Sequence, residues 1–226
     1  MKISIILPAY DEQENIEKAV EECDKVLPRH LAEYELVLVN DGSSDRTGEI
    51  IDKIAEQKLH VKALHHRQNK GLGAAVRTGV ENSEYEYIFL SPSDLQFDIA
   101  EIKNFIDAAG NADIIAGYRV SRNYNWYRKM NTRANLLLLT LLFGLRVRDP
   151  NWVKLFKRDI FEIAPIRYEG FFWDSQVLID AQKRGLKIKE IPAGIRDRVA
   201  GKASGSSPLR VFKTLLEMLK FRITNK

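Results

Sequence analysis

The fold of this 226-residue chain is decided by the stretch ISIILPAYDE, residues 3–12, which is answered about thirty residues later by LVLVNDGSSD, residues 36–45. Each stretch is a short apolar run that ends abruptly in polar residues. Such runs, without alternation, are typical of strands covered on both faces, as in a parallel sheet, where ligands bind beyond the carboxyl ends. The sequence therefore predicts a ligand site at Tyr10, Glu12 and Asp41. Each motif alone could be an ordinary turn and helix N-cap.

The rest of the chain continues this alternation up to about residue 116. Helical spacing covers 11–27, 45–57, 71–82 and 99–109, and strand-like runs cover 60–65, 87–90 and 113–116. No internal repeat or low-complexity linker divides the sequence. The predicted fold class is therefore α/β, a single domain with a mostly parallel sheet flanked by helices.

Composition is that of a folded protein, with 45% hydrophobic and 29% charged residues. The single cysteine, Cys23, excludes a disulfide framework and a thiolate metal cluster, which fits a reducing cytoplasm. Because Met1 and Lys2 lead directly into an apolar strand, we expect no signal peptide.

The net charge of +4 is unevenly distributed. Residues 117–148 contain seven basic and no acidic residues, and residues 196–226 contain eight basic and two acidic ones. The remainder of the chain therefore carries about −9. Two basic segments in an otherwise acidic chain favour an anionic partner: a phosphate, a membrane surface or a nucleic acid. No nucleic-acid-binding motif accompanies them, so we expect no nucleic-acid partner.

The first two strand ends carry a Pro-x-Tyr-x-Glu element at Pro8, Tyr10 and Glu12 and an Asp-Gly-Ser element at Asp41. This pair resembles the opening of the family 2 glycosyltransferases, enzymes with a Rossmann-like fold called GT-A. The resemblance implies that these four residues, with Val39, bind a nucleotide sugar.

The segment Asn69–Ala75 resembles the family's Asn-x-Gly element, which implies that Lys70 and Gly71 line the nucleotide cleft. Two glycines that open a helix, Gly71 and Gly73, would leave backbone N–H groups free to meet an anion. A Gly-x-Gly pair by itself is a weak signal and is often a plain helix start.

The strand at 87–90 is followed by Ser-Pro-Ser-Asp-Leu-Gln, where the family carries an Asp-x-Asp element that holds Mg²⁺ or Mn²⁺ against the diphosphate. Here Pro92 replaces the first Asp, whereas Asp94 and Gln96 remain. The resemblance implies a metal held by Asp94 and Gln96, with Ser93 beside the nucleotide sugar. Because a carboxylate is missing, we expect weak metal binding that depends on the diphosphate. A non-catalytic remnant is the alternative.

Several arginines match elements of the family's polyprenol-phosphate branch. Arg119 matches a Gly-x-Arg element that faces the phosphates, and either Arg128 or Arg133 matches an arginine of the next segment, so these three are the expected acceptor-phosphate ligands. Residues 190–202 resemble a loop of the dolichol-phosphate mannose synthases that closes over the diphosphate, which implies this role for Arg198 and Lys202.

Asp174 opens a helix at the place where many inverting members of the family carry the general base, and Gln176 stands where a Glu is common. A helix N-cap is the competing interpretation of Asp174. The expected catalytic residues are therefore Asp94, Arg119, Asp174 and Arg198. The resemblance implies inverting transfer of a sugar from a nucleoside diphosphate sugar to a polyprenyl phosphate, an anion that needs no base. Transfer to a hydroxyl group, with Asp174 as the base, is the alternative.

Membrane contact is expected at the chain's end. The apolar run 136–143 is eight residues long, too short for the ~20 needed to span a bilayer. Residues 205–226, which we separate from a glycosyltransferase domain at 1–204, predict a basic amphipathic helix with an apolar stripe of Leu209, Phe212, Leu215, Leu216 and Leu219. Such a helix anchors to an anionic membrane surface or docks on its own domain. We expect peripheral binding at the cytoplasmic face.

Overall fold

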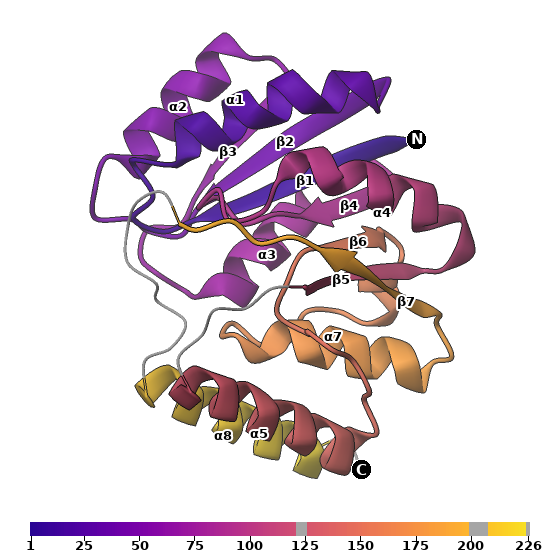
Figure 1. Ribbon diagram of the computed structural model, residues 1–226. Coiled ribbons are helices and arrows are strands. Elements are labelled where there is room, and N and C mark those ends of the chain that lie inside the picture. Colours follow the sequence, from indigo (N-terminus) through magenta and orange to yellow (C-terminus); the bar gives the residue numbers. More distant parts are fainter. Residues whose placement is uncertain (121–125, 199–207, 225–226) are drawn as a thin grey trace.

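The computed structural model describes residues 1–120, 126–198 and 208–224, and its centre is one seven-stranded sheet (Figure 1). The strands are β1 (Lys2–Ala9), β2 (Glu33–Asn40), β3 (Val61–His65), β4 (Tyr87–Leu90), β5 (Ile114–Arg119), β6 (Lys154–Lys157) and β7 (Ile188–Ala193). Their order across the sheet is β3-β2-β1-β4-β6-β5-β7.

All strands but β6 run in one direction. β1 pairs in parallel with β2 and β4, β2 with β3, and β5 with β7, whereas β6 is antiparallel to both of its neighbours, β4 and β5. The carboxyl ends of the six parallel strands therefore meet at one edge of the sheet, as the apolar runs predicted. The amino end of β6 lies at that same edge.

Helices cover both faces of the sheet (Figure 1). The helices are α1 (Ile16–Val26), α2 (Thr47–Gln57), α3 (Leu72–Glu81), α4 (Ile102–Ala108), α5 (Trp126–Phe143), α6 (Ile160–Ile163), α7 (Phe172–Lys183) and α8 (Pro208–Thr224), with short 3₁₀ turns at Leu27–Arg29, Ile99–Glu101 and Ala109–Asn111. One core joins α1, α2 and α4 to one face, and the other joins α3 and α7 to the opposite face. Side chains of β1 alternate between them, with Ile5 in the first core and Ile6 in the second.

The helix predicted over 11–27 begins later, at Ile16. Residues before it form a turn in which the N–H groups of Asn15 and Ile16 both donate to the carbonyl of Glu12. The apolar run 136–143 is the second half of α5. The predicted division between residues 204 and 205 falls within 199–207, outside the described residues.

The two helices α5 and α8 lie side by side outside α7 (Figure 1). The ring of Phe221 on α8 has its centroid 5.4 Å from that of Phe143 on α5 and 5.5 Å from that of Phe172 on α7. Met218 and Phe221 are buried in the second core, so α8 docks on the domain.

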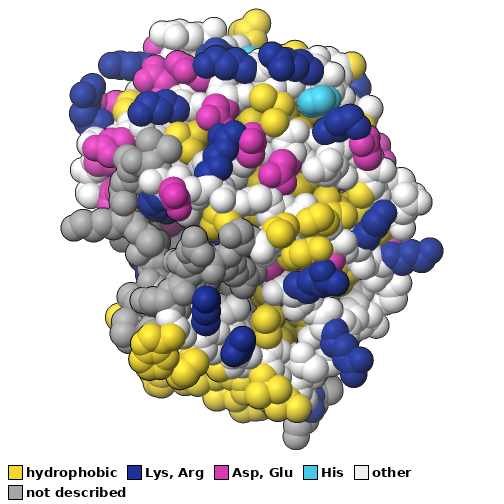
Figure 2. All heavy atoms as spheres, viewed as in Figure 1, with side chains coloured by type: hydrophobic (Ala, Val, Ile, Leu, Met, Phe, Trp, Pro, Cys, Tyr) yellow, Lys and Arg dark blue, Asp and Glu magenta, His cyan; other side chains and the backbone are white. Residues whose placement is uncertain are grey.

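The same two helices expose apolar side chains, visible as the hydrophobic lower margin of Figure 2. We call this the α5–α8 surface. Its exposed residues are Trp126, Met130, Leu137 and Leu141 on α5, and Leu209, Val211, Phe212, Leu216, Leu219 and Ile223 on α8. Helix α8 therefore packs on the domain with one face and exposes apolar side chains on the other. Of the described helices, none is both long enough and apolar enough to cross a membrane.

Candidate active site

The first two strand ends are bonded to each other. Asp11, which has a φ of +54°, donates its N–H to Ser43 Oγ at 3.0 Å and accepts the N–H of Ser44 on Oδ1 at 2.8 Å. The N–H of Glu12 donates to Thr47 Oγ1 at 2.9 Å. These bonds fix the turn that carries Tyr10, which is 41% exposed at the edge of the sheet.

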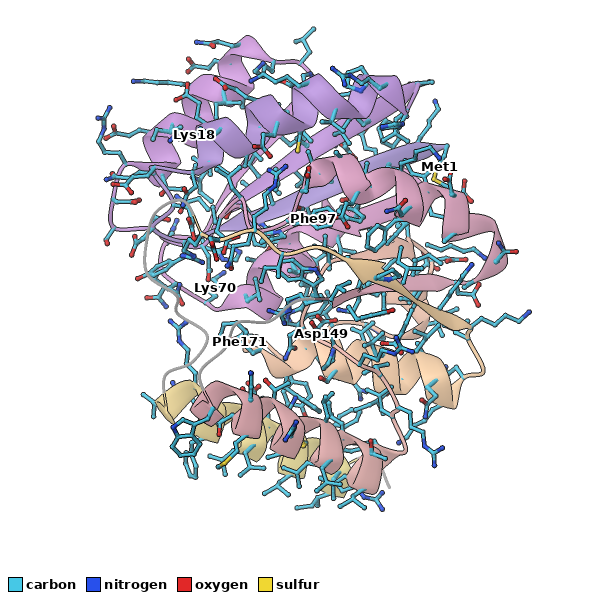
Figure 3. The ribbon with its side chains drawn as sticks, in the orientation of Figure 1. Met1, Lys18, Lys70, Phe97, Asp149 and Phe171 are labelled. Carbon is cyan, nitrogen blue, oxygen red and sulfur yellow. The ribbon has the colours of Figure 1, made fainter. Side chains whose placement is uncertain are left out.

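Asp41 is a buried carboxylate at the end of β2, and it holds the loop before α3. Its Oδ1 lies 2.6 Å from Nδ1 of His66 and accepts the N–H of Lys70 at 2.9 Å, while Oδ2 accepts the N–H of Gly71 at 2.9 Å. The ring of His66 continues to Thr78 Oγ1, 2.9 Å from Nε2. Asp41 thereby sets the position of Lys70, whose side chain is exposed where the strands end (Figure 3).

The free N–H groups predicted at the start of α3 are not there, and that part of the interpretation is wrong. Those of Lys70 and Gly71 bond to Asp41, and that of Gly73 donates to the carbonyl of Glu169 at 2.8 Å. Gly71 has a φ of +102°, and a Cβ there would lie 2.5 Å from the Glu169 oxygen. A Cβ on Gly73 would lie 2.1 Å from the carbonyl oxygen of Tyr168. The glycines are needed because the loop before α7 approaches α3 this closely.

Asp94 lies at the end of β4 and is 6% exposed. Its Oδ1 accepts the N–H of Gln96 at 3.1 Å, and its Oδ2 lies 2.5 Å from Nη2 of Arg198. Ser93 points toward β1, where its hydroxyl donates to the carbonyl of Pro8 at 2.9 Å. The expected residues of β1 and β4 are thus brought together.

Residues 194–198, which follow β7, cross above the ends of β1 and β4. Arg196 donates its N–H to the carbonyl of Gln96 at 2.7 Å, and its guanidinium pairs with Glu22 and Asp98. Arg198 pairs with Asp94 and lies 3.5 Å from Oε1 of Glu12. The position predicted for Lys202 lies outside the described residues.

The electrostatics of this cluster are set by burial. Burial raises the pKa of the Glu12 carboxyl above its ordinary value, although a bond from Asn15 and the positive charge of Arg198 act in the opposite direction. The negative charge of Asp94 adds to the increase. Arg198 is therefore the cation that offsets two converging carboxylates.

A divalent cation fits this site best when a phosphate supplies further ligands. Across the described ranges, no group of three or more His, Cys, Asp or Glu side chains is placed to hold a metal ion. Asp94 offers one buried carboxylate, and Gln96 follows two residues later. Mg²⁺ commonly binds through one or two carboxylates and completes its shell with water and substrate phosphates. The donor set fits such an ion.

Arg119, at the end of β5, is held by Asp149. Its Nε lies 2.6 Å from Oδ2 and its Nη2 2.9 Å from Oδ1, a bidentate pair. The guanidinium also lies 4.7 Å from the centre of the Trp152 ring. Of the other two expected phosphate ligands, Arg133 is exposed on α5, and the side chain of Arg128 is outside the described part of the structure.

Asp174 is neither an N-cap nor exposed. Helix α7 begins at Phe172, so Asp174 lies in its first turn, and its Oδ2 accepts a hydrogen bond from Lys154 Nζ at 2.7 Å. Lys154 is fully buried and also donates to the carbonyls of Pro150 and Trp152. Burial raises the pKa of Asp174 to about 6, against the lowering effect of Lys154.

Gln176 has a structural place. It is fully buried, its Oε1 accepts the N–H of Arg167 at 2.9 Å, and its Nε2 donates to the carbonyl of Pro165 at 3.0 Å. Both halves of the amide are therefore used, which explains a Gln rather than a Glu at this position.

The sequence predicted no role in the site for His66, and it matched Asp149 and Lys154 to a family element without a role for either. His66 and Asp149 carry a usable signal, since His66 directly follows β3 and Asp149 shortly precedes β6 at the edge where ligands bind. A lysine at the start of an apolar strand gives no such indication. Asp149 lies near the middle of the view in Figure 3, with Lys70 on its left.

Comparison with known proteins agrees with this architecture. The sequence model of the family described as "Glycosyl transferase family 2" matches residues 4–173. A dolichol-phosphate mannosyltransferase from Pyrococcus furiosus is 28% identical over 232 residues, covering 98% of this chain and 64% of that protein. An undecaprenyl-phosphate 4-deoxy-4-formamido-L-arabinose transferase from Proteus mirabilis is 28% identical over 150 residues, covering 66% of this chain and 46% of that protein. The chain thus spans less than two thirds of the length of these relatives.

Among solved structures, glucosyl-3-phosphoglycerate synthase from Mycobacterium tuberculosis, in complex with Mn²⁺, UDP and glucosyl-3-phosphoglycerate, superposes with a TM-score of 0.74. The identity is 19%, and the match covers 98% of this chain and 79% of the other. At this identity the likeness shows the fold, and it confirms the predicted GT-A arrangement.

Proposed function

The chain belongs to glycosyl transferase family 2, and we propose that it moves a sugar, with inversion, from a nucleoside diphosphate sugar to a polyprenyl phosphate. The two relatives named for transfer involving dolichol phosphate and undecaprenyl phosphate support this acceptor class. The donor binds at the edge formed by the ends of β1, β2 and β4, where Tyr10, Asp41 and Asp94 lie.

The observation that carries the choice of acceptor is the state of Asp174. A general base must reach the proton that it removes, within about 3 Å or through one water. Asp174 is 6% exposed and its Oδ2 is engaged by the ammonium of Lys154 at 2.7 Å. A phosphate acceptor is already an anion and can attack the anomeric carbon without a base. Asp174 is therefore unsuited to act as the general base for a hydroxyl acceptor, and a phosphate acceptor needs no general base.

The remaining demands of the reaction are cationic. The departing diphosphate and the acceptor phosphate both need positive charge, and bidentate arginine bonds supply it in a fixed geometry. Arg198 lies on the donor side, next to Asp94, and Arg119 lies across from it at the end of β5. A divalent cation held by Asp94 and Gln96 would neutralise charge on the diphosphate as it leaves.

The α5–α8 surface supplies the contact with the membrane that a polyprenyl substrate requires. Its apolar side chains are flanked by basic residues, among them the exposed Lys213 and Lys220 on α8 and Arg133 on α5. Helices with an apolar face and basic flanks lie in the interface of anionic membranes. The chain then works as a peripheral protein on the cytoplasmic face.

The test is a transfer assay with a panel of nucleotide sugars, offered with polyprenyl phosphate in vesicles and with hydroxyl acceptors, with and without Mn²⁺. We expect product only with the phosphate acceptor, and more of it with Mn²⁺. Transfer restricted to a hydroxyl acceptor would replace this proposal with the second chemistry. Failure to transfer any sugar, with nucleotide bound, would indicate a non-catalytic remnant.

A further inference from the structure

The guanidinium of Arg198 lies against Asp94, the carboxylate that the sequence predicts to hold the donor's divalent cation. Its Nη2 lies 2.5 Å from Oδ2 of Asp94 and its Nη1 3.5 Å from Oε1 of Glu12. The side chain is 21% exposed, and its two carboxylate partners are 9% and 11% exposed. Pro92 offers no carboxylate beside them. Arg198 is therefore bound to the same carboxylate that a divalent ion needs.

Two cations cannot share this carboxylate without cost. Asp94 already uses Oδ1 to accept the N–H of Gln96, which leaves Oδ2 as the oxygen that Arg198 bonds. A divalent ion on that oxygen would stand within a few ångströms of the guanidinium, where like charges repel strongly at low exposure.

The segment that carries Arg198 is anchored independently of the bonds that the Arg198 side chain makes to Asp94 and Glu12. Arg196 is anchored by its N–H to the carbonyl of Gln96 and by its guanidinium to Glu22 and Asp98. Gly194 donates its N–H to Glu101 Oε2 at 2.9 Å. These anchors involve neither Asp94 nor Glu12, so they persist when Arg198 loses its partners.

We propose that Arg198 and the donor's divalent cation are alternative occupants of Asp94, so that loading of the metal releases Arg198 to bind the diphosphate. This rests on the proposed function, because the metal arrives with a nucleoside diphosphate sugar. Without donor, Arg198 neutralises the carboxylates and keeps affinity for metal alone low. With donor, the diphosphate supplies ligands to the metal and a new bidentate partner to the arginine.

The experiment measures binding of Mn²⁺ alone to the full chain, by the loss of the free-ion signal in electron paramagnetic resonance, without nucleotide. Arg198→Met removes the competing charge, Arg198→Lys keeps it, and Arg196→Met removes a neighbouring charge that pairs with other carboxylates. We expect Arg198→Met to bind Mn²⁺ at least about tenfold more tightly than the wild type. Arg198→Lys and Arg196→Met should stay close to the wild type.

An unchanged or weaker affinity of Arg198→Met for Mn²⁺ would overturn the proposal that Arg198 and the metal compete for Asp94. So would equal tightening in Arg196→Met, because the effect would then be one of net charge. The titration uses no donor, acceptor or turnover, so its outcome is separate from that of the transfer assay. A chain that transfers sugar but binds Mn²⁺ equally with and without Arg198 would keep the proposed function and lose this inference.

Discussion

The substitution Asp174→Asn separates the two acceptor chemistries. If a polyprenyl phosphate attacks without a base, turnover should stay within about threefold of the wild type, less than 1 kcal/mol in activation free energy. If Asp174 were the base for a hydroxyl acceptor, its loss should reduce the rate by about 10²–10⁴. Because Asp174 is buried against Lys154, we expect the small effect.

The structure also sets the effect of this substitution on stability. Burial raises the pKa of Asp174 from its ordinary 3.8 to about 6, so the ionised form costs about 3 kcal/mol of folding free energy at neutral pH. Asparagine removes that cost and can still accept the bond from Lys154. Its amide group takes the place of Oδ1, a buried atom with no hydrogen-bond partner among the described residues, and leaves a buried donor unsatisfied at about 1–3 kcal/mol. The substitution also leaves the fully buried ammonium of Lys154 without its counter-charge, at about 3–5 kcal/mol, so the variant should be less stable than the wild type at neutral pH.

The sign of the pH dependence follows from the raised pKa. The stability that wild-type Asp174 contributes is fully present below the unfolded pKa of 3.8 and is lost as the pH rises through about 6. The Asn variant has no such group. Its stability relative to the wild type should therefore improve by about 1–1.5 kcal/mol between about pH 5 and about pH 7.5.

Two measurements on the same preparations check this reasoning: steady-state transfer to polyprenyl phosphate, and urea unfolding at the two pH values. A loss of turnover of about 100-fold or more, in a variant that is still folded at the assay pH, would refute the phosphate-acceptor chemistry and identify Asp174 as the base. A stability difference that does not vary with pH would refute the account of its buried charge.

Three further outcomes are expected. Lys154→Met should lower the free energy of unfolding by about 3–5 kcal/mol, measured by urea unfolding, because it leaves Asp174 buried without its cation. If the double variant Lys154→Met/Asp174→Leu recovered none of this loss, the ion pair would not be its cause. Asp94→Asn should reduce turnover strongly at low Mn²⁺ and less at high Mn²⁺. Full activity of the wild type in excess chelator would show that the reaction needs no metal at this site. Lys213→Glu with Lys220→Glu should weaken co-sedimentation with anionic vesicles at least about tenfold, since each basic residue near the membrane surface is worth about 1 kcal/mol. The matched control is Lys18→Glu with Lys53→Glu, which makes the same charge change on α1 and α2. Equal loss of binding in the two double variants would exclude α8 as the anchor.

Much of the sheet and of its ligand-binding edge could be predicted because strand ends are readable in the sequence. The apolar runs before Tyr10 and Asp41 stop where the buried faces stop, and β4 was predicted with its observed bounds, Tyr87–Leu90. The side chains that follow such strands necessarily lie at one edge when the strands are parallel. The positions of these site residues at the edge of the sheet could thus be predicted from the local sequence pattern alone.

The partners of those side chains were not accessible, because they depend on contacts between distant segments. Asp41 bonds to N–H groups about 30 residues away, and the glycine pair that resembled an anion site instead admits the loop before α7. Asp174 has the local signature of a cap, yet Lys154, which packs against it, comes from a strand 20 residues earlier. Burial of the charge decided its role, and burial is a tertiary property.

The reversed direction of β6 explains why so much charge converges on this site. Its amino end, Lys154, is in register with Leu90, the last residue of β4, and with Ala116 in the middle of β5. The turn that precedes β6 therefore enters the ligand edge from the opposite direction and delivers Asp149 to Arg119. A parallel strand in this position would place that turn at the far edge of the sheet, and Arg119 would lose its bidentate partner. Because Lys154 bonds both the turn and Asp174, one buried ammonium ties the arginine of β5 to the first turn of α7. The charge that makes Asp174 a poor base is, by this geometry, the same charge that holds the turn behind Arg119.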